Sequence, residues 1–270
     1  MDSPTLRRVV LGLQYDGAPW QGWQTQSSGL TVQDRLEVAL QKFSCQVQQT
    51  HCAGRTDAGV HALAQVVHFD TPVLRSPGSW VRGVNAFLPP SIAVRWAAEV
   101  PALSPDGFHA RFSARARTYY YALYNHPVRA PLLVGKTGWV FRPLDLDAMR
   151  EGANLLLGTH DFTAFRSVDC QAKSPVKTLQ QLGIVQRGEM VVLVFRANAF
   201  LHHMVRNIVG SLTHVGKGKQ PPVWIAELLA SRDRSLAAPT FMADGLYLAK
   251  IDYDARWGLP HESEAAFPWR

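Results

Sequence analysis

The order of the predicted elements indicates an α+β protein made of two ferredoxin-like (RRM-like) halves. Each half reads strand, helix, strand, strand, helix, strand, which is the order of a split βαβ unit, and the second half carries one further helix. The turn-rich segment 101–107 separates the halves, so we expect domains at residues 1–104 and 105–270. Two such units side by side predict an extended, mostly antiparallel sheet with a central cleft, the usual place for a substrate.

The composition is that of a globular protein with a sizeable core. The 270 residues are 47% hydrophobic and 18% charged. Three cysteines, Cys45, Cys52 and Cys170, are odd in number and lack CxxC spacing, which argues against a disulfide framework or a zinc cluster. The first residues do not form a signal peptide and no apolar run reaches membrane-spanning length, so we expect a cytoplasmic protein without a membrane partner.

The charge balance points to a polyanionic partner. Lysines and arginines number 28 against 21 acidic residues, a formal net charge of +7. Such an excess favours fast electrostatic capture of a nucleic acid, and a mildly basic surface that keeps the protein soluble is the alternative. Because the arginines are spread along the chain rather than massed in a tail, any basic surface must be produced by folding.

The first half is predicted from apolar runs whose spacing changes between that of a strand and that of a helix. Residues 7–15 are apolar and β-branched at their centre, which suits a buried strand. Thr31 is a good N-cap with Asp34 at the third helical position, and apolar residues recur at helical spacing as far as Phe43. The other predicted elements are strands at 47–53 and 60–69, a helix near 80–87 and a strand at 92–97.

Two tryptophans and two amides follow the first strand, at Trp20-Gln21-Gly22-Trp23-Gln24. Such a segment could stack on nucleotides and hydrogen-bond to them. A pair of tryptophans that covers the edge of the sheet is the commoner arrangement, and the residues alone favour it.

The second half begins with a basic and aromatic stretch. Residues 108–117 are rich in arginine and lead into a strand at 118–124 with three consecutive tyrosines. Tyr119 and Tyr121 must share one face of that strand and Tyr120 the other. One face therefore belongs to the core, and the other offers a base-stacking platform beside Arg111, Arg115 and Arg117.

The rest of the second half alternates helices with a hairpin. We expect a helix capped by Asp145, a loop at 158–166, a hairpin of strands 178–186 and 190–197, helices at 201–215 and 222–231, and a last strand at 246–253. The helix at 201–215 buries one apolar face. His202, His203, Arg206 and Asn207 are turned away from that face, and the two histidines and Arg206 suit contacts with phosphates or bases.

A glycine loop at residues 54–59, here called the Asp57 loop, is the candidate reactive segment. Arg55 and Asp57 lie two residues apart between Gly54 and Gly59, with strand-like sequence on either side. A nearby arginine favours the ionised aspartate, and a loop held between strands is where a reactive carboxylate is expected. The alternative is a structural Arg–Asp pair that closes a turn, and composition alone leaves both open.

Several familiar sites are missing from the sequence. There is no GxGxxG, Walker or Gx-Ser-xG motif, which removes the usual nucleotide-triphosphate and hydrolase interpretations. His202-His203 is not an HExxH motif and does not place two imidazoles with a carboxylate on one helical face, so no metal is predicted. What remains fits cofactor-free chemistry on a nucleic acid.

The stretch CAGRTDAGVHALAQVVHF at 52–69 resembles the tRNA pseudouridine synthase A family, bacterial enzymes that act on the anticodon stem-loop. The resemblance does not rest on one motif. It continues through YDG at 15–17, GWQ at 22–24, VNA at 84–86, FHARFS at 108–113, AFLHHMVRNIVG at 199–210 and GLYL at 245–248. Together these motifs cover residues 7–253 in the family's order.

The resemblance implies roles for particular residues. Asp57 matches the family's catalytic aspartate and Arg55 the arginine of the same motif. Tyr119 matches the active-site tyrosine that lies against the target base, and Arg206 the basic residue that pairs with the aspartate. Leu246 or Leu248 matches the apolar residue that lines the pocket. The family also implies a homodimer that holds one tRNA with both subunits and uses no cofactor or metal.

The implied reaction converts uridine to pseudouridine at positions 38, 39 and 40 of tRNAs. It breaks the N1–C1′ bond, turns the uracil and rejoins it through C5, with a carboxylate as nucleophile or base. The alternative is a non-catalytic RNA-binding or chaperone module. Phosphotransfer through Asp57 lacks the further acidic residues that would hold magnesium. Arg55 either holds Asp57 ionised or serves the RNA, and the residues leave this open.

Overall fold

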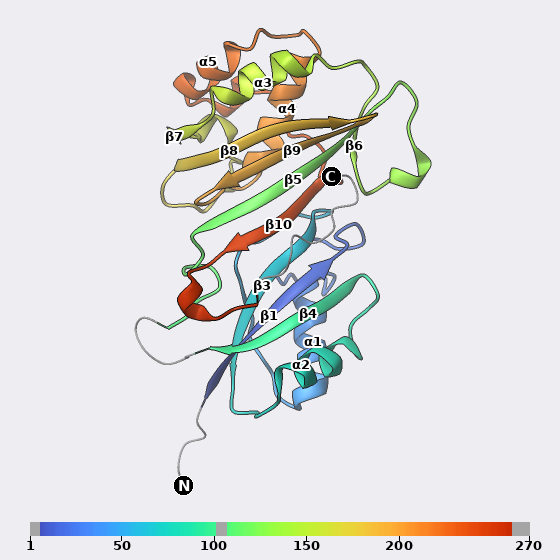
Figure 1. Ribbon diagram of the computed structural model, residues 1–270, viewed down its shortest axis with the longest axis vertical. Coiled ribbons are helices and arrows are strands. Elements are labelled where there is room, and N and C mark those ends of the chain that lie inside the picture. The colour runs from blue at the N-terminus through green and yellow to red at the C-terminus, as the bar shows by residue number, and fades with distance from the viewer. Residues whose placement is uncertain (1–5, 101–106, 261–270) are drawn as a thin grey trace. The chain divides into compact units, whose positions relative to one another are not determined.

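The computed structural model describes residues 6–100 and 107–260 (Figure 1). These residues fall into two compact units. Unit one contains residues 6–100, 107–115 and 248–260, and unit two contains residues 116–247. All but the last residue of the predicted linker at 101–107 lies outside the described residues, and the domain limits 1–104 and 105–270 stay a prediction.

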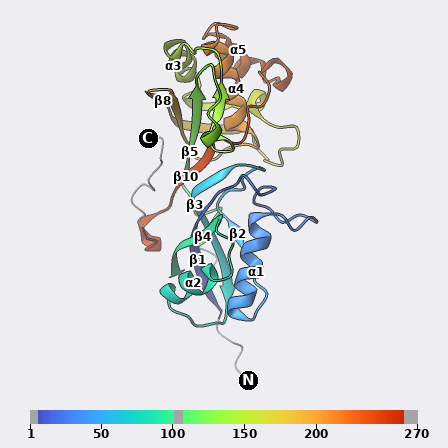
Figure 2. The same ribbon diagram turned by 90° about the vertical axis from the view of Figure 1, so that its right-hand side faces the viewer.

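Unit one has the element order that the sequence predicts. Its elements are β1 (Arg7–Tyr15), α1 (Val32–Ser44), β2 (His51–Cys52), β3 (His61–Thr71), α2 (Pro77–Asn85) and β4 (Ile92–Val100). Strand β1 lies between β4 and β3 and is antiparallel to both, and β2 pairs with β3. The two helices contact each other and lie beside the strands of the unit (Figure 2).

Helix α1 begins where the sequence predicts, because a capping box defines its start. The Thr31 hydroxyl accepts a hydrogen bond from the Asp34 amide at 3.2 Å, and the Asp34 carboxylate accepts one from the Thr31 amide at 3.2 Å. Behind this cap, Leu36 and Leu40 are completely buried. The helical spacing of the apolar residues therefore identified the core-facing side correctly.

Strand β2 is much shorter than the predicted strand at 47–53. Only His51 and Cys52 pair with β3. The amide of Thr50 donates instead to the Glu37 carboxylate of α1 at 2.9 Å, and its hydroxyl bonds the same oxygen at 2.8 Å. A backbone donor that is satisfied by a helix side chain is not available to a strand partner, so pairing begins only after Thr50.

Unit two contains more strands than the predicted order. Its elements are β5 (Ala116–Asn125), β6 (Gly138–Val140), α3 (Leu146–Asn154), β7 (Gly158–Asp161), β8 (Val176–Arg187), β9 (Met190–Ala197), α4 (Met204–Gly216) and α5 (Trp224–Ser231). Strands β5, β9, β8 and β7 pair in this order, antiparallel throughout, and β6 joins β5 in parallel. The predicted hairpin is confirmed. Short β6 and β7 are additions, and β7 occupies the start of the segment expected as a loop.

The last strand, β10 (Leu246–Asp252), is divided between the units after its second residue. In unit one it follows β3 in the strand order, and in unit two it precedes β5. Each unit thus combines helices with a mainly antiparallel group of strands, which confirms the predicted α+β class. The central cleft stays a prediction. None of the described helices is long and apolar enough to cross a membrane.

The three tyrosines of β5 do not form an exposed platform. Tyr119, Tyr120 and Tyr121 are 8%, 5% and 0% exposed. They alternate across the strand as expected, opposite Phe195, Val194 and Leu193 of β9. Because side chains on both faces are buried, the expectation of an open face on this strand is wrong. Contact of Tyr119 with a target base stays a prediction.

Helix α4 begins three residues later than predicted, at Met204. The cause is His203, which has a left-handed backbone with φ of +62°. A left-handed residue cannot continue an α-helix, so Leu201 and His202 form a turn outside it, closed by a bond from the Met204 amide to the Leu201 carbonyl at 3.0 Å. Leu201 is nevertheless buried, as the apolar spacing predicts.

Candidate active site

The Asp57 loop connects β2 to β3 and is fixed at both of its ends. Before the loop, the Ala53 amide donates to the Val66 carbonyl at 2.8 Å, and the Gln65 side chain donates to the Gly54 carbonyl at 2.6 Å. After it, the Val60 amide donates to the Asp57 carbonyl at 3.1 Å. Gly59, inside this turn, has φ of +79°, a conformation that favours glycine.

The segment with the two tryptophans clamps this loop from the side. The Trp23 amide donates to the Thr56 carbonyl at 2.9 Å, and the Gly59 amide donates to the Trp20 carbonyl at 3.3 Å. The Trp23 side chain is buried at 1% exposure. Of the two interpretations of this segment, packing rather than base stacking therefore accounts for Trp23.

Gly22 makes this close approach possible. Its φ is +84°, and a Cβ atom at this position would lie 2.7 Å from the Thr56 carbonyl oxygen and 3.1 Å from the Asp57 carbonyl carbon. Both the backbone conformation and the missing side chain are thus required. The backbone of Asp57 is positioned by a segment more than thirty residues earlier in the chain.

A buried polar network lies under the loop. The Tyr15 hydroxyl and the Thr56 hydroxyl are 2.8 Å apart, and the Gln65 amide nitrogen lies 3.4 Å from the Tyr15 oxygen. Gln65 is completely buried, and the loop carbonyl of Gly54 satisfies its side chain. No motif in the sequence predicts this network. Its sequence signal is a glutamine between the apolar residues Ala64 and Val66 of β3.

The Asp16-Gly17 turn contacts Val60 and His61, which follow the Asp57 loop. The Gly17 amide donates to Nδ1 of His61 at 3.0 Å, and an Asp16 carboxylate oxygen lies 3.0 Å from the same nitrogen. A Cβ atom on Gly17 would lie 1.9 Å from the Val60 carbonyl oxygen. This second glycine contact explains why the YDG motif belongs to the site although its residues precede the loop by some forty positions.

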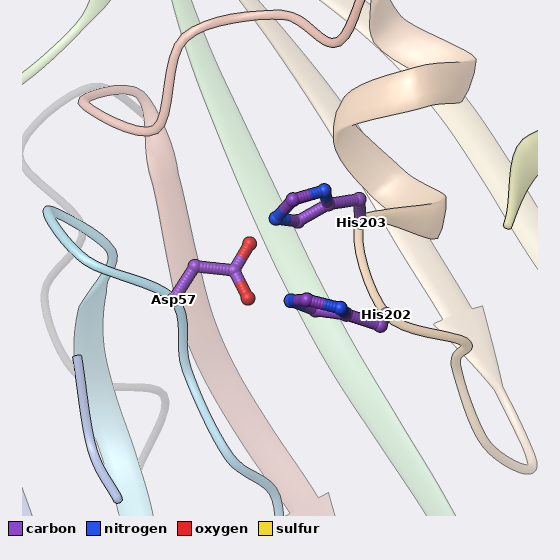
Figure 3. A group of neighbouring side chains, drawn as sticks. All are labelled: Asp57, His202 and His203. Carbon is purple, nitrogen blue, oxygen red and sulfur yellow. The ribbon is translucent and has the colours of Figure 1, made fainter. Parts of the chain in front are cut away.

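The side chains of the Asp57 loop differ in exposure. Asp57 is half-buried and Arg55 is exposed. Burial of the neighbouring Cys52 thiol raises its pKa to about 12, and the charges of Arg55 and Arg111 act in the opposite direction. Both guanidinium groups therefore lie within electrostatic range of Cys52. Figure 3 shows Asp57 extending from this loop, and His202 and His203 extending from the turn before α4.

In unit two, Arg206 lies in the first turn of α4 and is half-buried. Its Nε donates to the Phe241 carbonyl at 2.9 Å, and the Phe241 amide donates to the Arg206 carbonyl at 3.2 Å. Burial and Asp244 raise the pKa of Tyr121 well above its usual range, whereas Arg206 acts to lower it. The guanidinium thus lies close enough to Tyr121 to influence the pKa of its hydroxyl.

Tyr119 and the histidine pair flank the same turn. The Tyr119 ring meets the ring of Phe200 edge to face, with centroids 5.0 Å apart. The rings of His202 and His203 lie 4.0 Å apart, with His202 exposed and His203 half-buried. Aromatic side chains therefore gather around the segment that leads into α4.

Asn207 is completely buried. The sequence-based expectation that it turns away from the core with its neighbours is therefore wrong. Its amide nitrogen donates to the Phe165 carbonyl at 2.8 Å, and its amide oxygen accepts from the Thr240 hydroxyl at 2.7 Å and from Arg234 at 3.1 Å. Three polar partners from distant segments satisfy the amide, which is why a polar residue is stable there.

The site residues expected from the sequence divide between the two units. Unit one holds Arg55, Asp57 and Arg111, and unit two holds Tyr119, His202, His203, Arg206 and Leu246. Both candidate pocket leucines are buried, with Leu246 in unit two and Leu248 in unit one. The catalytic and substrate-binding roles of all these residues stay predictions.

Comparison with known proteins identifies the family. The family model for tRNA pseudouridine synthase matches residues 13–113 and 153–254. A tRNA pseudouridine synthase A of Herminiimonas arsenicoxydans is 66% identical over 99% of this chain and 98% of the relative. A protein of the same name from Burkholderia mallei (strain NCTC 10229) is 58% identical over 98% of this chain and 96% of the relative. These findings confirm the resemblance found in the motifs, and the chain belongs to the tRNA pseudouridine synthase family, a family of isomerases.

Proposed function

We propose that this protein isomerises uridine to pseudouridine in the anticodon stem-loop of tRNAs, at positions 38, 39 and 40, with Asp57 as the catalytic carboxylate. The observation that carries the proposal is the Asp57 loop itself. Its backbone is bound on both sides by β3 and by the 20–23 segment, and its carboxylate is half-buried. Such a loop holds a reactive group in one place, as catalysis requires.

The chemistry needs no redox partner. The N1–C1′ bond of uridine breaks, the uracil turns and a C5–C1′ bond forms. The C5 proton leaves and N1 takes up a proton, so atoms and electrons balance and the product is an isomer of uridine. Asp57 acts on the nucleoside as nucleophile or as base. Arg206 is the cation that favours its ionised form. Tyr119 lies against the uracil, and Leu246 lines the pocket from the same unit as Tyr119.

The remaining assignments concern the RNA. The target uridine must leave its stack to reach a half-buried carboxylate, at a cost of a few kcal/mol. The net charge of +7 supports binding of the tRNA backbone, to which Arg55, Arg111, His202 and His203 contribute. We further propose a cytoplasmic homodimer that holds one tRNA with both subunits and acts without a cofactor or metal.

The test is to incubate the purified protein with unmodified tRNA without any added cofactor and to map pseudouridine in the product. The wild type should form pseudouridine in the anticodon stem-loop. Asp57→Asn should bind the tRNA with unchanged affinity and form none. Asp147→Asn, which alters an exposed aspartate of α3, is the control and should behave as the wild type.

Two results would contradict the proposal. Formation of pseudouridine by Asp57→Asn at the wild-type rate would remove Asp57 from catalysis. If the wild type binds tRNA and forms no pseudouridine, the non-catalytic RNA-binding or chaperone module would replace the enzyme.

A further inference from the structure

An exposed aromatic group in unit one is not used by the proposed reaction. The Phe112 side chain is 76% exposed. Its ring lies 4.3 Å from that of His109, and the Arg111 guanidinium lies 5.8 Å from its centroid. His51 continues the group, with its ring 5.5 Å from His109. We call His51, His109, Arg111 and Phe112 the Phe112 platform.

Buried groups hold this platform in a fixed conformation. His68, 2% exposed, stacks on His51 at 5.0 Å and meets His109 at 4.6 Å. Its Nδ1 accepts a hydrogen bond from the Ala110 amide at 3.2 Å. The segment that carries Phe112 is thus attached to β3, and the exposed ring is presented by a rigid base rather than by a free loop.

Local hydrogen bonds orient the platform residues further. Nδ1 of His109 accepts from the Arg111 amide at 3.1 Å, and the Ser113 hydroxyl accepts from the His109 amide at 2.9 Å. Arg8 donates to the Phe108 carbonyl at the start of the same segment. A preorganised aromatic surface loses little conformational entropy when a ligand stacks on it.

The electrostatic surroundings of the platform are positive. Arg111 belongs to it, and Arg55 of the Asp57 loop acts with Arg111 on the nearby Cys52 thiol. Asp70 acts electrostatically on His51 and His68, and Arg8 holds it in a two-point ion pair with distances of 2.8 and 2.7 Å. Cations beside flat aromatic faces suit a nucleotide, whose phosphate is anionic and whose base has a π-face.

We propose that the Phe112 platform stacks an unpaired nucleotide of the RNA substrate, while Arg55 and Arg111 contact the adjoining phosphates. This inference rests on the proposed function for the identity of the RNA. It adds a base-contacting surface to unit one, separate from the nucleoside on which Asp57 acts. It also gives Arg55 a role in binding the RNA rather than in holding Asp57 ionised.

Substitution of Phe112 tests the stacking contact. Phe112→Ala should weaken binding of unmodified tRNA about tenfold, because a base that stacks on an aromatic ring loses its partner. Phe112→Tyr should restore the wild-type affinity, since it restores the ring. The matched control is Phe87→Ala, which removes another exposed ring, 46% exposed, with a cation over it (Lys42, 6.0 Å away) in the same unit. It should bind tRNA as the wild type does.

The salt dependence of tRNA binding distinguishes the stacking contact of Phe112 from the phosphate contact of Arg111. Arg111→Gln should reduce the slope of log affinity against log salt by about 0.7 to 0.9, the value for one lost phosphate contact. Phe112→Ala should leave that slope unchanged while it lowers affinity at every salt concentration. Equal slopes for Arg111→Gln and the wild type would overturn the phosphate contact.

The outcomes for the platform and for the enzyme are distinguishable. If pseudouridine forms normally and Phe112→Ala binds tRNA as the wild type does, the platform alone is overturned. If the wild type and Phe112→Ala differ in affinity as expected but neither forms pseudouridine, the platform stands and the proposed function fails. A change in oligomeric state of Phe112→Ala with unchanged tRNA affinity would assign the ring to a protein interface and overturn the proposal.

Discussion

The Asp57 loop of unit one and the turn before α4 in unit two are held in different ways. Hydrogen bonds to the backbone, one of them from the buried Gln65 side chain, and close contacts of Gly22 and Gly17 fix the first. Side chains at the start of α4 fix the second, where the buried amide of Asn207 bonds to three partners and the half-buried Arg206 bonds to the Phe241 carbonyl. The Asp57 loop should therefore be sensitive to substitutions that add side-chain atoms, and the turn before α4 to substitutions that remove them.

The largest effect is expected where a side-chain atom is added at Gly22, in the segment that contacts the Asp57 loop. Gly22→Ala brings a Cβ atom 2.7 Å from the Thr56 carbonyl oxygen, so the backbone of Asp57 must move. A displacement of about 1 Å in a catalytic group can cost about a hundredfold in rate. We therefore expect at least that loss in single-turnover pseudouridine formation, measured with excess enzyme.

Gly29→Ala is the control for this change. Gly29 has φ of +64°, similar to that of Gly22, but no atom lies within 4 Å of its Cβ position. Both variants carry the backbone strain of about 1–3 kcal/mol, and only Gly22→Ala carries the collision. Equal rates of pseudouridine formation for the two variants would show that the contact of Gly22 with the Asp57 loop does not position Asp57.

The next effect is expected where atoms are removed from unit two. Asn207→Ala leaves the Phe165 carbonyl, the Thr240 hydroxyl and Arg234 without their buried partner. Loss of a satisfied buried amide should lower the free energy of unfolding by about 3 kcal/mol. Urea unfolding would measure this loss. Asn154→Ala, at an exposed position of α3, should change it by less than about 0.5 kcal/mol.

Acid should destabilise unit one through His68. Burial, then His109, Arg8 and His51, lower the pKa of His68 to about 3, whereas the unfolded chain titrates near 6.5. Below pH 6.5 the unfolded state binds the proton more readily, so stability is complete above that pH and declines as the pH falls towards 3. At pH 5 the titration of His68 should lower the free energy of unfolding by about 2 kcal/mol. Urea unfolding at pH 7.5 and pH 5 would measure it.

His68→Asn tests the assignment of this pH dependence. The asparagine oxygen can accept the hydrogen bond from the Ala110 amide, and the side chain does not titrate. The variant should lose much of the difference in stability between the two pH values. His109, whose pKa is lowered by burial and then by His51, contributes with the same sign and accounts for what remains. An unchanged pH dependence would contradict the role of His68.

The smallest effect is expected from the polar network under the loop. Tyr15→Phe removes the hydroxyl that lies 2.8 Å from the Thr56 hydroxyl. The expected cost is about 1 kcal/mol of stability, accompanied by a lower rate of pseudouridine formation. Tyr124→Phe loses an exposed bond to Glu189 and should change neither quantity measurably.

Prediction from sequence succeeded where neighbouring residues decide the structure. The start of α1 follows from Thr31 and Asp34, three residues apart. The hairpin of β8 and β9 follows from two apolar runs around Arg187-Gly188-Glu189. It failed for β2, because the amide of Thr50 bonds to a glutamate thirteen residues earlier. Contacts of this kind leave no periodic signal in the sequence.

The sequence by itself determined the α+β class, the order of elements in unit one and the family, because these depend on local spacing and on motifs read in order. It also located Asp57 within a glycine loop. Only the tertiary structure decided what holds that loop, that Asn207 is buried and that Phe112 is presented on a base of histidines. Each of these depends on residues distant in the chain, whose contact is set by packing and by the need to satisfy buried polar groups.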